Sequence, residues 1–327
     1  MRYVLLSIQL ISNALYPTIS HIIKDLFGLD IPLPFATFGV FMVLAFIAAS
    51  PVLKSELKRK EQLRLIKPAL NKKGRRIIPH MQVGNILLIT AVSGILGARV
   101  FSILENPKEL IADPMETLFS SSGLTFYGGL IFAIIAIWVY AKKIKLSITH
   151  LADAAAPALL LAYGVGRLGC HLSGDGDWGI DNLSPKPSWM NFLPDWMWAY
   201  NYPNNVIGAG VSYSGTDGEY CTVLVNPVFP TPFYEFLFGI LFFTIFWLIR
   251  KRITIPGLMF FIYLTVSGLE RYLIEQIRID SEYNIGRYYI KQAEIIAFIS
   301  IFVGAFAVSY ILVRKNDFYK NINSNKR

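Results

Sequence analysis

Long runs of apolar residues recur along the chain and are separated by shorter polar stretches. Each run holds about 18 or more residues, enough to cross a hydrocarbon core roughly 30 Å thick. Such a segment must be helical, because lipid offers no hydrogen-bond partner to backbone groups. The pattern predicts about seven transmembrane helices, at residues 34–53, 84–103, 123–141, 147–170, 230–249, 256–274 and 292–313.

Residues 1–30 are more polar than these runs. Gln9, Ser12 and Asn13 interrupt the apolar stretch at 3–23, which we expect to be a helix lying along the membrane interface. We see no small-residue cleavage site after it, so a cleaved signal peptide is not expected.

The composition agrees with a membrane protein. Apolar residues make up 54% of the 327 residues and charged residues only 16%, with a mean hydropathy of +0.46. A soluble domain holds nearer 25% charged residues. We therefore expect an all-α integral membrane protein that forms a single polytopic domain over residues 1–327.

The distribution of positive charge predicts the orientation. Of the 31 Lys and Arg residues, 21 fall in the stretches 54–80, 142–146, 250–252 and 314–327, and such residues accumulate on the cytoplasmic side. We expect these stretches inside, with a basic cytoplasmic loop at 54–80, a cytoplasmic tail at 314–327 and the N-terminus outside. The net charge of +9 then reflects topology and contact with membrane lipids, and no nucleic-acid partner is expected.

The connection at 171–229 differs from the others in length and composition. It lies on the predicted outer side and carries Trp178, Trp189, Trp196 and Trp198. A stretch this long is rarely a bare connector. We expect a folded extracytoplasmic cap that rests on the membrane, with its Trp and Tyr side chains at headgroup depth.

Three arginines, Arg99, Arg167 and Arg271, lie inside predicted spans. A charge at the centre of a span costs at least about 2.5–3.5 kcal/mol, so such residues point to function. Each of the three lies within about four residues of the outer end of its span, which predicts a shared depth. The alternative is that each arginine only extends to the interface to anchor its helix.

Carboxylates accompany these arginines. Glu235 follows Tyr234 at the outer end of the fifth span. Glu275 lies one helical turn beyond Arg271, placed for an i,i+4 ion pair, and Arg278 lies two turns beyond Arg271 on the same face. Because the planar fork of arginine suits phosphate, the residues predict an anion site at the depth of the outer leaflet. A phospholipid headgroup is its expected occupant.

Several motifs follow one another in a characteristic order. Residues 166–179 read Gly-Arg-Leu-Gly-Cys-His-Leu-Ser-Gly-Asp-Gly-Asp-Trp-Gly, residues 126–130 read Phe-Tyr-Gly-Gly-Leu, and residues 230–235 read Pro-Thr-Pro-Phe-Tyr-Glu. Residues 97–99 read Gly-Ala-Arg, and residues 268–271 read Gly-Leu-Glu-Arg. Together these motifs resemble the signatures of the bacterial prolipoprotein diacylglyceryl transferase family, over about residues 30–313.

The resemblance implies an activity and its partners. The family transfers a diacylglyceryl group from phosphatidylglycerol to the lipobox cysteine thiol of a prolipoprotein, at the outer leaflet of the bacterial cytoplasmic (inner) membrane. The chain would then be a multi-pass enzyme with an N-out topology, which binds phosphatidylglycerol and the signal peptide of a prolipoprotein. The resemblance assigns catalysis to Arg167 and Arg271, and these residues are expected to bind the headgroup together with Arg99, Glu235, Tyr234, Asp175, Gly179 and Arg278.

The chain departs from the family pattern at several positions. Tyr127 stands where the family has a catalytic histidine, Cys170 and Ser173 where it has asparagines, and Phe38 where it has a tyrosine. We expect Tyr127 to hydrogen-bond the headgroup and His171 to act as the base, since an ordinary histidine pKa near 6.5 suits that role. The alternative is a family-like protein that binds or presents a lipid or lipoprotein without catalysis.

Some polar and cysteine residues have two interpretations each. Asp175 and Asp177 could orient Arg167, or they could build a turn through side-chain hydrogen bonds. Two cysteines cannot form a metal cluster, and no metal or soluble-cofactor motif is present, so neither a metal nor a cofactor is expected. Cys170 could pair with Cys221, but we favour a packing role.

Two further features are expected to serve packing inside the membrane. The pair at 128–129 consists of glycines, which allow neighbouring helices to approach closely. Asp153, nearer the inner end of the fourth predicted span, is expected to pair with backbone or with another helix.

Overall fold

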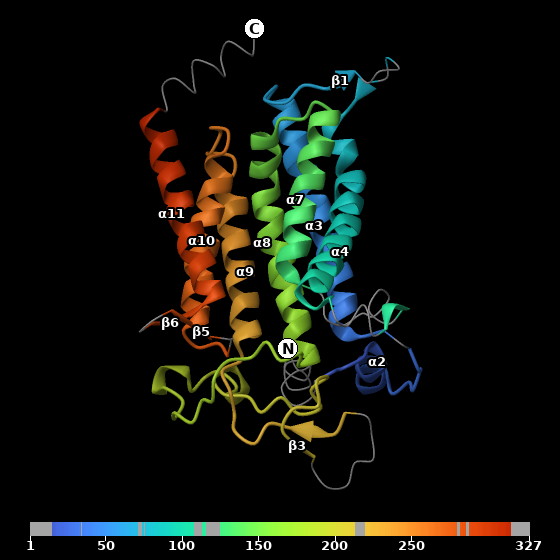
Figure 1. Ribbon diagram of the computed structural model, residues 1–327, viewed down its shortest axis with the longest axis vertical. Coiled ribbons are helices and arrows are strands. Elements are labelled where there is room, and N and C mark those ends of the chain that lie inside the picture. The colour runs from blue at the N-terminus through green and yellow to red at the C-terminus, as the bar shows by residue number, and fades with distance from the viewer. Residues whose placement is uncertain are drawn as a thin grey trace. The chain divides into compact units, whose positions relative to one another are not determined.

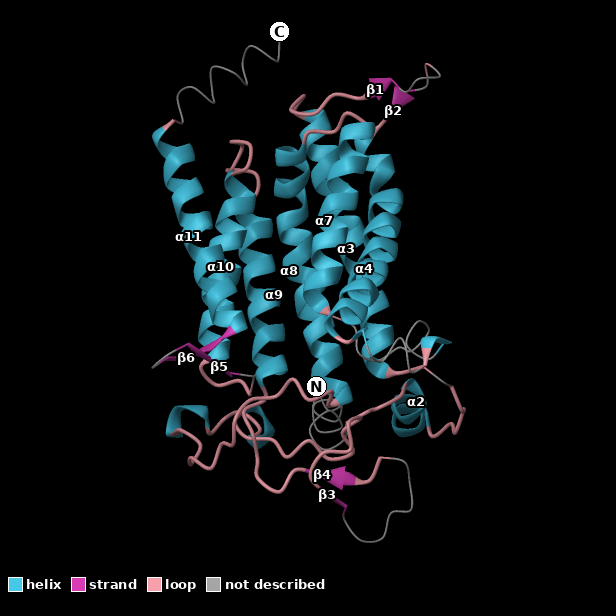
Figure 2. Cartoon of the chain, viewed as in Figure 1, coloured by secondary structure: helices cyan, strands magenta, loops and turns pink. Residues whose placement is uncertain are grey.

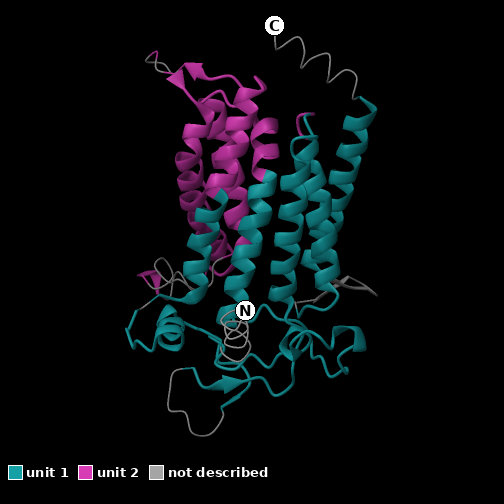
Figure 3. Ribbon diagram, turned by 180° about the vertical axis from the view of Figure 1, so that it is seen from behind, with its two compact units in different colours: residues 1–49, 156–254, 258–314 teal, residues 50–155, 255–257, 315–327 magenta. Residues whose placement is uncertain are grey.

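The computed structural model describes residues 15–33, 35–70, 74, 76–107, 113–115, 125–212, 220–279, 282–285 and 288–314. Helices dominate the described residues (Figures 1 and 2). The chain forms two compact units, each of which is described by itself (Figure 3). Unit 1 comprises residues 1–49, 156–254 and 258–314, and unit 2 comprises residues 50–155, 255–257 and 315–327.

Seven long helices coincide with the seven apolar runs. They are α3 (Thr37–Gln62), α4 (Val83–Glu105), α7 (Phe126–Lys143), α8 (Ile148–Ser173), α9 (Thr231–Ile249), α10 (Leu258–Glu275) and α11 (Gln292–Val313). Among the described residues, 6 helices are long and apolar enough to cross a membrane, and α10 is not one of them. Three charged residues in the last turn and a half of α10, Glu270, Arg271 and Glu275, make this helix less apolar than the others. The chain is therefore a helical multi-pass membrane protein.

The helix α3 runs further than its apolar run. It continues through Gln62, so the start of the predicted basic loop at 54–80 is helical. This extension buries Lys60, whose Nζ atom lies 3.4 Å from Asp153 Oδ2, and Asp153 also accepts the backbone N–H of Gly257 at 2.9 Å. The expectation that Asp153 pairs with backbone and with another helix is confirmed.

Within unit 2, α4 and α7 pack at a contact between glycines. A Cβ atom added at Gly97 would collide with the carbonyl oxygen of Gly128, and one added at Gly129 would lie 2.9 Å from the carbonyl oxygen of Gly94. Only glycine permits backbones to approach this closely. The packing role expected for the glycine pair at 128–129 is thus confirmed.

Short elements connect the long helices. The helix α2 covers Ile19–Phe27, so it overlaps the interfacial helix predicted at 3–23 only in residues 19–23, and residues 1–14 lie outside the described residues. Each of three antiparallel pairs has two strands. They are β1 (Ala69–Leu70) with β2 (Arg76–Ile77), β3 (Val211–Ser212) with β4 (Thr222–Val223), and β5 (Glu282–Ile285) with β6 (Tyr288–Lys291). The 3-10 turns are η1 (Pro79–Gln82), η2 (Ser188–Met190) and η3 (Asp195–Met197).

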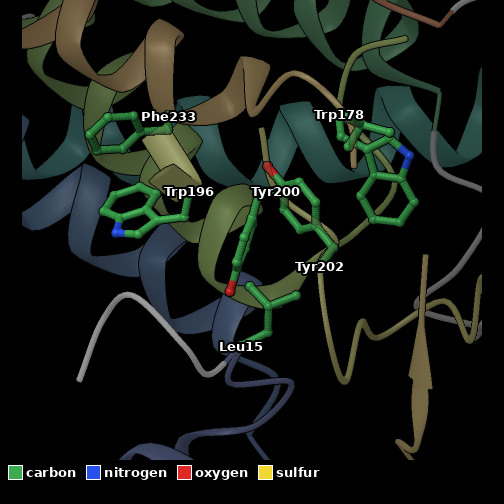
Figure 4. Close-up of a cluster of buried hydrophobic side chains, with 7 residues drawn as sticks. Leu15, Trp178, Trp196, Tyr200, Tyr202 and Phe233 are labelled. Atoms are coloured by element: carbon green, nitrogen blue, oxygen red, sulfur yellow. The ribbon is translucent and has the colours of Figure 1, made fainter. Parts of the chain in front are cut away.

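The cap at 171–229 packs around a hydrophobic core that includes Leu15 and Phe233 from outside it, shown in Figure 4. We call it the aromatic cluster; its buried members are Leu15, Trp178, Trp196, Tyr200, Tyr202, Val228 and Phe233. Trp178 and Trp196 are buried in this core, so these two side chains pack the cap itself, and the headgroup depth expected for the cap tryptophans stays a prediction. Trp189, by contrast, is 70% exposed.

Candidate functional site

A fully buried carboxylate on α9 lies at the centre of the site. Glu235 has no exposed surface, and its Oε2 atom lies 3.3 Å from Nε of Arg167 on α8. Its Oε1 atom lies 3.8 Å from a terminal nitrogen of Arg271 and 3.7 Å from one of Arg278. We call Arg167, Arg271 and Arg278 the arginine cluster. A buried carboxylate requires cationic partners, and the three arginines supply them for Glu235.

Close helix packing positions this carboxylate. A Cβ atom added at Gly239 of α9 would lie 2.8 Å from the Cα atom of Gly164 on α8. At the start of α9 the buried hydroxyl of Thr231 donates to the backbone carbonyl of Asp177 at 2.7 Å. The motif at 230–235 thus fastens the cap to the helix that carries Glu235.

Asp177 joins two members of the arginine cluster. Its carboxylate pairs with Arg167 through one oxygen and with Arg278 through the other. Burial alone would raise the pKa of Asp177, but the charges of Arg167 and Arg278 outweigh it and lower the pKa below its usual value. Asp177 therefore remains ionised at neutral pH and belongs to the site, although the sequence equally allowed it a turn role.

Asp175 has the turn role instead. Its Oδ1 atom accepts the backbone N–H of Asp177 at 3.3 Å, as in a side-chain-built turn. Burial, with the nearby negative charge of Asp177, raises the pKa of Asp175. Asp175 makes no ion pair among the described residues, so it shapes the loop that presents Asp177.

The end of α10 supplies a second layer of pairing. Arg271 lies 3.0 Å from Glu275, one turn further along the helix, so the expected i,i+4 pair is confirmed. Glu275 is also 3.6 Å from Nζ of Lys291, which donates to the backbone carbonyls of Glu275 and Arg278 at 2.8 and 2.7 Å. A cation that caps the last carbonyls of a helix is favourable. Lys291 therefore anchors the end of α10 beside the arginines.

Two residues expected to bind a headgroup, Gly179 and Tyr234, make structural contacts in the cap. The backbone N–H of Gly179 donates to the carbonyl oxygen of Phe229 at 2.8 Å. Gly179 also forms an antiparallel bridge with Arg278. A Cβ atom added at Gly179 would collide with the carbonyl oxygen of Ile277. The hydroxyl of Tyr234 donates to the carbonyl of Met197 at 2.8 Å. Gly179 and Tyr234 hold the cap against α9 and α10.

The structure does not bring His171 to the arginine cluster. Its ring is 2% exposed and stacks on Trp196 with centroids 5.4 Å apart. Its Nδ1 atom lies 3.1 Å from the hydroxyl of Tyr202, and Tyr200 and Phe233 pack around it. Because these aromatic rings enclose the imidazole, the geometry goes against the expected role of His171 as the base and favours a packing role.

Arg99 and Tyr127 belong to unit 2, and the structure brings them to the same end of the α4–α7 pair. The backbone N–H of Thr125 donates to the carbonyl of Ala98 at 3.3 Å, so the residue after Ala98 and the start of α7 lie at one level. The place of Arg99 and Tyr127 beside the arginine cluster remains a prediction.

The cysteines and Ser173 make local contacts. Within the described residues no disulfide joins Cys170 to Cys221, and Cys170 is buried, in agreement with the packing role favoured for it. The hydroxyl of Ser173 donates to the carbonyl of Cys170 at 3.2 Å. Possible ligand atoms of Cys170, Asp175 and Asp177 lie within 4.8 Å of one another, but two arginines already pair with Asp177, so we assign no metal to them.

The arginine cluster offers a site for an anion. The side chains of Arg167, Arg271 and Arg278 are 18%, 24% and 11% exposed, so each keeps some surface beyond its carboxylate contacts. Guanidinium groups in such a shielded setting bind phosphate oxygens strongly. They also stabilise negative charge that develops on a leaving group.

Comparison with known proteins gives a consistent result. A model of the family described as prolipoprotein diacylglyceryl transferase matches residues 24–310. The phosphatidylglycerol–prolipoprotein diacylglyceryl transferase of Leptospira interrogans is 27% identical over 343 residues, covering 89% of this chain and 93% of that protein. The protein of the same name from Corynebacterium glutamicum is 27% identical over 230 residues, covering 69% of this chain and 67% of its own length.

Proposed function

The chain belongs to the prolipoprotein diacylglyceryl transferase family, and on that premise we propose that it transfers a diacylglyceryl group from phosphatidylglycerol to the lipobox cysteine thiol of a prolipoprotein. The observation that best supports this proposal is the arginine cluster around Glu235. The reaction releases an anionic glycerol phosphate, and three guanidinium groups from α8 and the end of α10 suit that anion.

The chemistry requires charge stabilisation at the phosphate. The thiol, whose ordinary pKa is about 8.5, loses its proton to a base. The thiolate sulfur forms a bond to the carbon of the diacylglyceryl group that carries the phosphate. The bond from that carbon to the phosphate oxygen breaks. The phosphate leaves with the electron pair and gains negative charge. Arg167 and Arg271 stabilise this charge, which grows in the transition state.

The remaining site residues have supporting roles. Glu235 and Asp177 fix the guanidinium planes, because each carboxylate contacts at least two members of the arginine cluster. Arg99 and Tyr127, from the paired ends of α4 and α7, are proposed as further headgroup contacts. The acyl chains remain in the lipid while the headgroup reaches the arginines.

The reaction is proposed to occur at the outer leaflet of the bacterial inner membrane. On this view α10 is a seventh span, the N-terminus is outside, and the cap at 171–229 is extracytoplasmic. Support comes from the basic stretches at 54–80 and 314–327, which favour the cytoplasmic side. The charges that lower the hydropathy of α10 pair with one another and with neighbouring helices.

Thiol labelling checks this orientation. A cysteine at the exposed position of Lys58 should react with a membrane-impermeant reagent only after spheroplasts are permeabilised, whereas one at the exposed Asp195 should react without permeabilisation. Lys60 is unsuitable because it is buried against Asp153. Cys221 is replaced by serine to remove background. Labelling of the Lys58→Cys variant in intact spheroplasts would reverse the assignment.

Complementation tests the activity. In a strain depleted of its own diacylglyceryl transferase, expression of this chain should restore growth and convert a prolipoprotein to its lipid-modified form. Correct membrane insertion is verified on the same cells. Failure to complement, with correct insertion and retained binding of phosphatidylglycerol, would favour the alternative of a family member that binds or presents a lipid without catalysis.

A further inference from the structure

A tyrosine on α8 bridges two buried carboxyl groups on neighbouring helices. The hydroxyl oxygen of Tyr163 lies 2.8 Å from Oε1 of Glu235 on α9 and 2.9 Å from Oε1 of Glu270 on α10. Glu235 is 0% exposed and Glu270 is 4% exposed. Both distances fall in the range of O–H···O hydrogen bonds, roughly 2.5–3.0 Å, so each contact requires a hydrogen atom.

Counting hydrogens shows that the tyrosine alone cannot satisfy both contacts. A phenol carries one hydrogen and an ionised carboxylate carries none. If Glu235 and Glu270 were both ionised, three oxygens would share a single hydrogen, and two buried anions would face the same hydroxyl. One of the two carboxyl groups must therefore supply the second hydrogen.

The surroundings decide which carboxyl group is protonated. Glu235 lies within 4.0 Å of nitrogen atoms from all three members of the arginine cluster, which favours its ionised form. Glu270 makes no ion pair among the described residues, and its contact there is Tyr163. Burial without a cationic partner favours the neutral acid.

We propose that Glu270 is a protonated carboxylic acid that donates to Tyr163, which in turn donates to the ionised Glu235. Glu270 and Tyr163 then act as positioning residues for the arginine cluster, a role that rests on the proposed function. The hydrogen bond from Tyr163 fixes Oε1 of Glu235 and so orients the carboxylate. Its other oxygen, Oε2, is thereby directed toward Nε of Arg167. A neutral Glu270 also adds no competing negative charge, so the arginines remain available to a phosphate.

Infrared spectroscopy of the purified, membrane-embedded protein tests the protonation directly. At neutral pH the wild type should show the C=O stretch of a buried carboxylic acid, and Glu270→Gln should lack it. The control Glu294→Gln removes a carboxylate that accepts from Gln276 and from the backbone of Lys291, and it should keep the band. Loss of the band in Glu235→Gln instead of Glu270→Gln would overturn the assignment, and so would an unchanged band in Glu270→Gln.

Transfer kinetics test the positioning role. Glu270→Gln should stay within about threefold of the wild type at neutral pH, because an amide N–H replaces the acid O–H as donor. Tyr163→Phe breaks the chain and should lose about tenfold, as for one buried hydrogen bond. Wild-type activity should fall at alkaline pH as Glu270 loses its proton, whereas Glu270→Gln should not show this fall. The same alkaline fall in both proteins would contradict the role.

The groups around Glu270 are known, which makes the pH profile interpretable. Glu270 interacts electrostatically or by hydrogen bonding with five charged or titratable side chains, which are Tyr163, Arg167, Glu235, Tyr263 and Arg271. Because only Glu270 is changed in Glu270→Gln, a difference in the alkaline limb reports on its proton.

The two readouts separate this proposal from the proposed function. The infrared band depends on the proton of Glu270 and not on turnover. A protein that shows the expected band but transfers no diacylglyceryl group would keep the protonation assignment and refute the activity. An active protein without the band would support the transfer activity and refute the protonation of Glu270.

Discussion

Replacing Arg167 by alanine should abolish diacylglyceryl transfer, lowering its rate by a factor of about 10²–10³ or more, as for loss of a donor to a developing anion. Arg167 contacts both carboxylates that organise the site, Glu235 and Asp177. Its removal therefore withdraws a phosphate ligand and loosens the loop that presents Asp177. The measurement is conversion of a prolipoprotein in vesicles that contain phosphatidylglycerol.

The conservative variant sharpens this prediction. Arg167→Lys keeps the charge but loses the planar fork, so it should restore only part of the activity. Arg252→Lys, at an exposed position in the turn after α9, is the matched control and should behave as the wild type. Full activity of Arg167→Lys would show that a point charge suffices, and full activity of Arg167→Ala would remove Arg167 from the mechanism.

Replacing Glu235 by alanine should have the largest effect on stability. The change leaves three guanidinium groups without their common buried partner, and breaking a buried ion pair typically costs about 3–5 kcal/mol. Glu235→Ala should therefore unfold at a lower temperature and transfer no lipid. Thermal unfolding in detergent, followed together with transfer in vesicles, measures both effects.

A second buried carboxylate provides the control for Glu235. Glu56 is 2% exposed and pairs with Arg59 one turn away on α3, in unit 2. Glu56→Ala should also lower the unfolding temperature, but the folded fraction should keep its transfer rate. If Glu235→Ala and Glu56→Ala lose transfer to the same extent at equal stability, the special position of Glu235 is refuted.

The sequence predicted the positions of the seven long helices well, because that prediction uses local information. Apolar runs and the cost of unsatisfied backbone in lipid define each span without knowledge of its neighbours. The apolar run alone did not show where helix α3 ends, since the helix continues beyond the run among charged residues to Gln62. Lys60 is buried there only because Asp153, 93 residues away, reaches it.

The site was predictable where a charge stands in an apolar run, and less so elsewhere. Arg167, Arg271 and Glu235 were found because lipid makes an unpaired charge costly. Asp177 lies in a polar loop, where nothing in the local pattern separates an ion pair from a turn, and its partner Arg278 is 101 residues away. The local sequence around His171 gave no sign of the aromatic cluster that encloses its ring, because the members of that cluster come from distant parts of the chain.

The charged end of α10 has a consequence for how the protein enters the membrane during synthesis. As the proposed seventh span, α10 would bring Glu270, Arg271 and Glu275 into lipid, and each ionised side chain would carry an insertion cost of about 2.5–3.5 kcal/mol at mid-membrane. Two groups that lower this cost, Tyr163 and Glu235, precede α10 in the chain. They leave the ribosome first, so both groups have been synthesised when α10 emerges. The order of translation thus supplies partners before the helix that needs them.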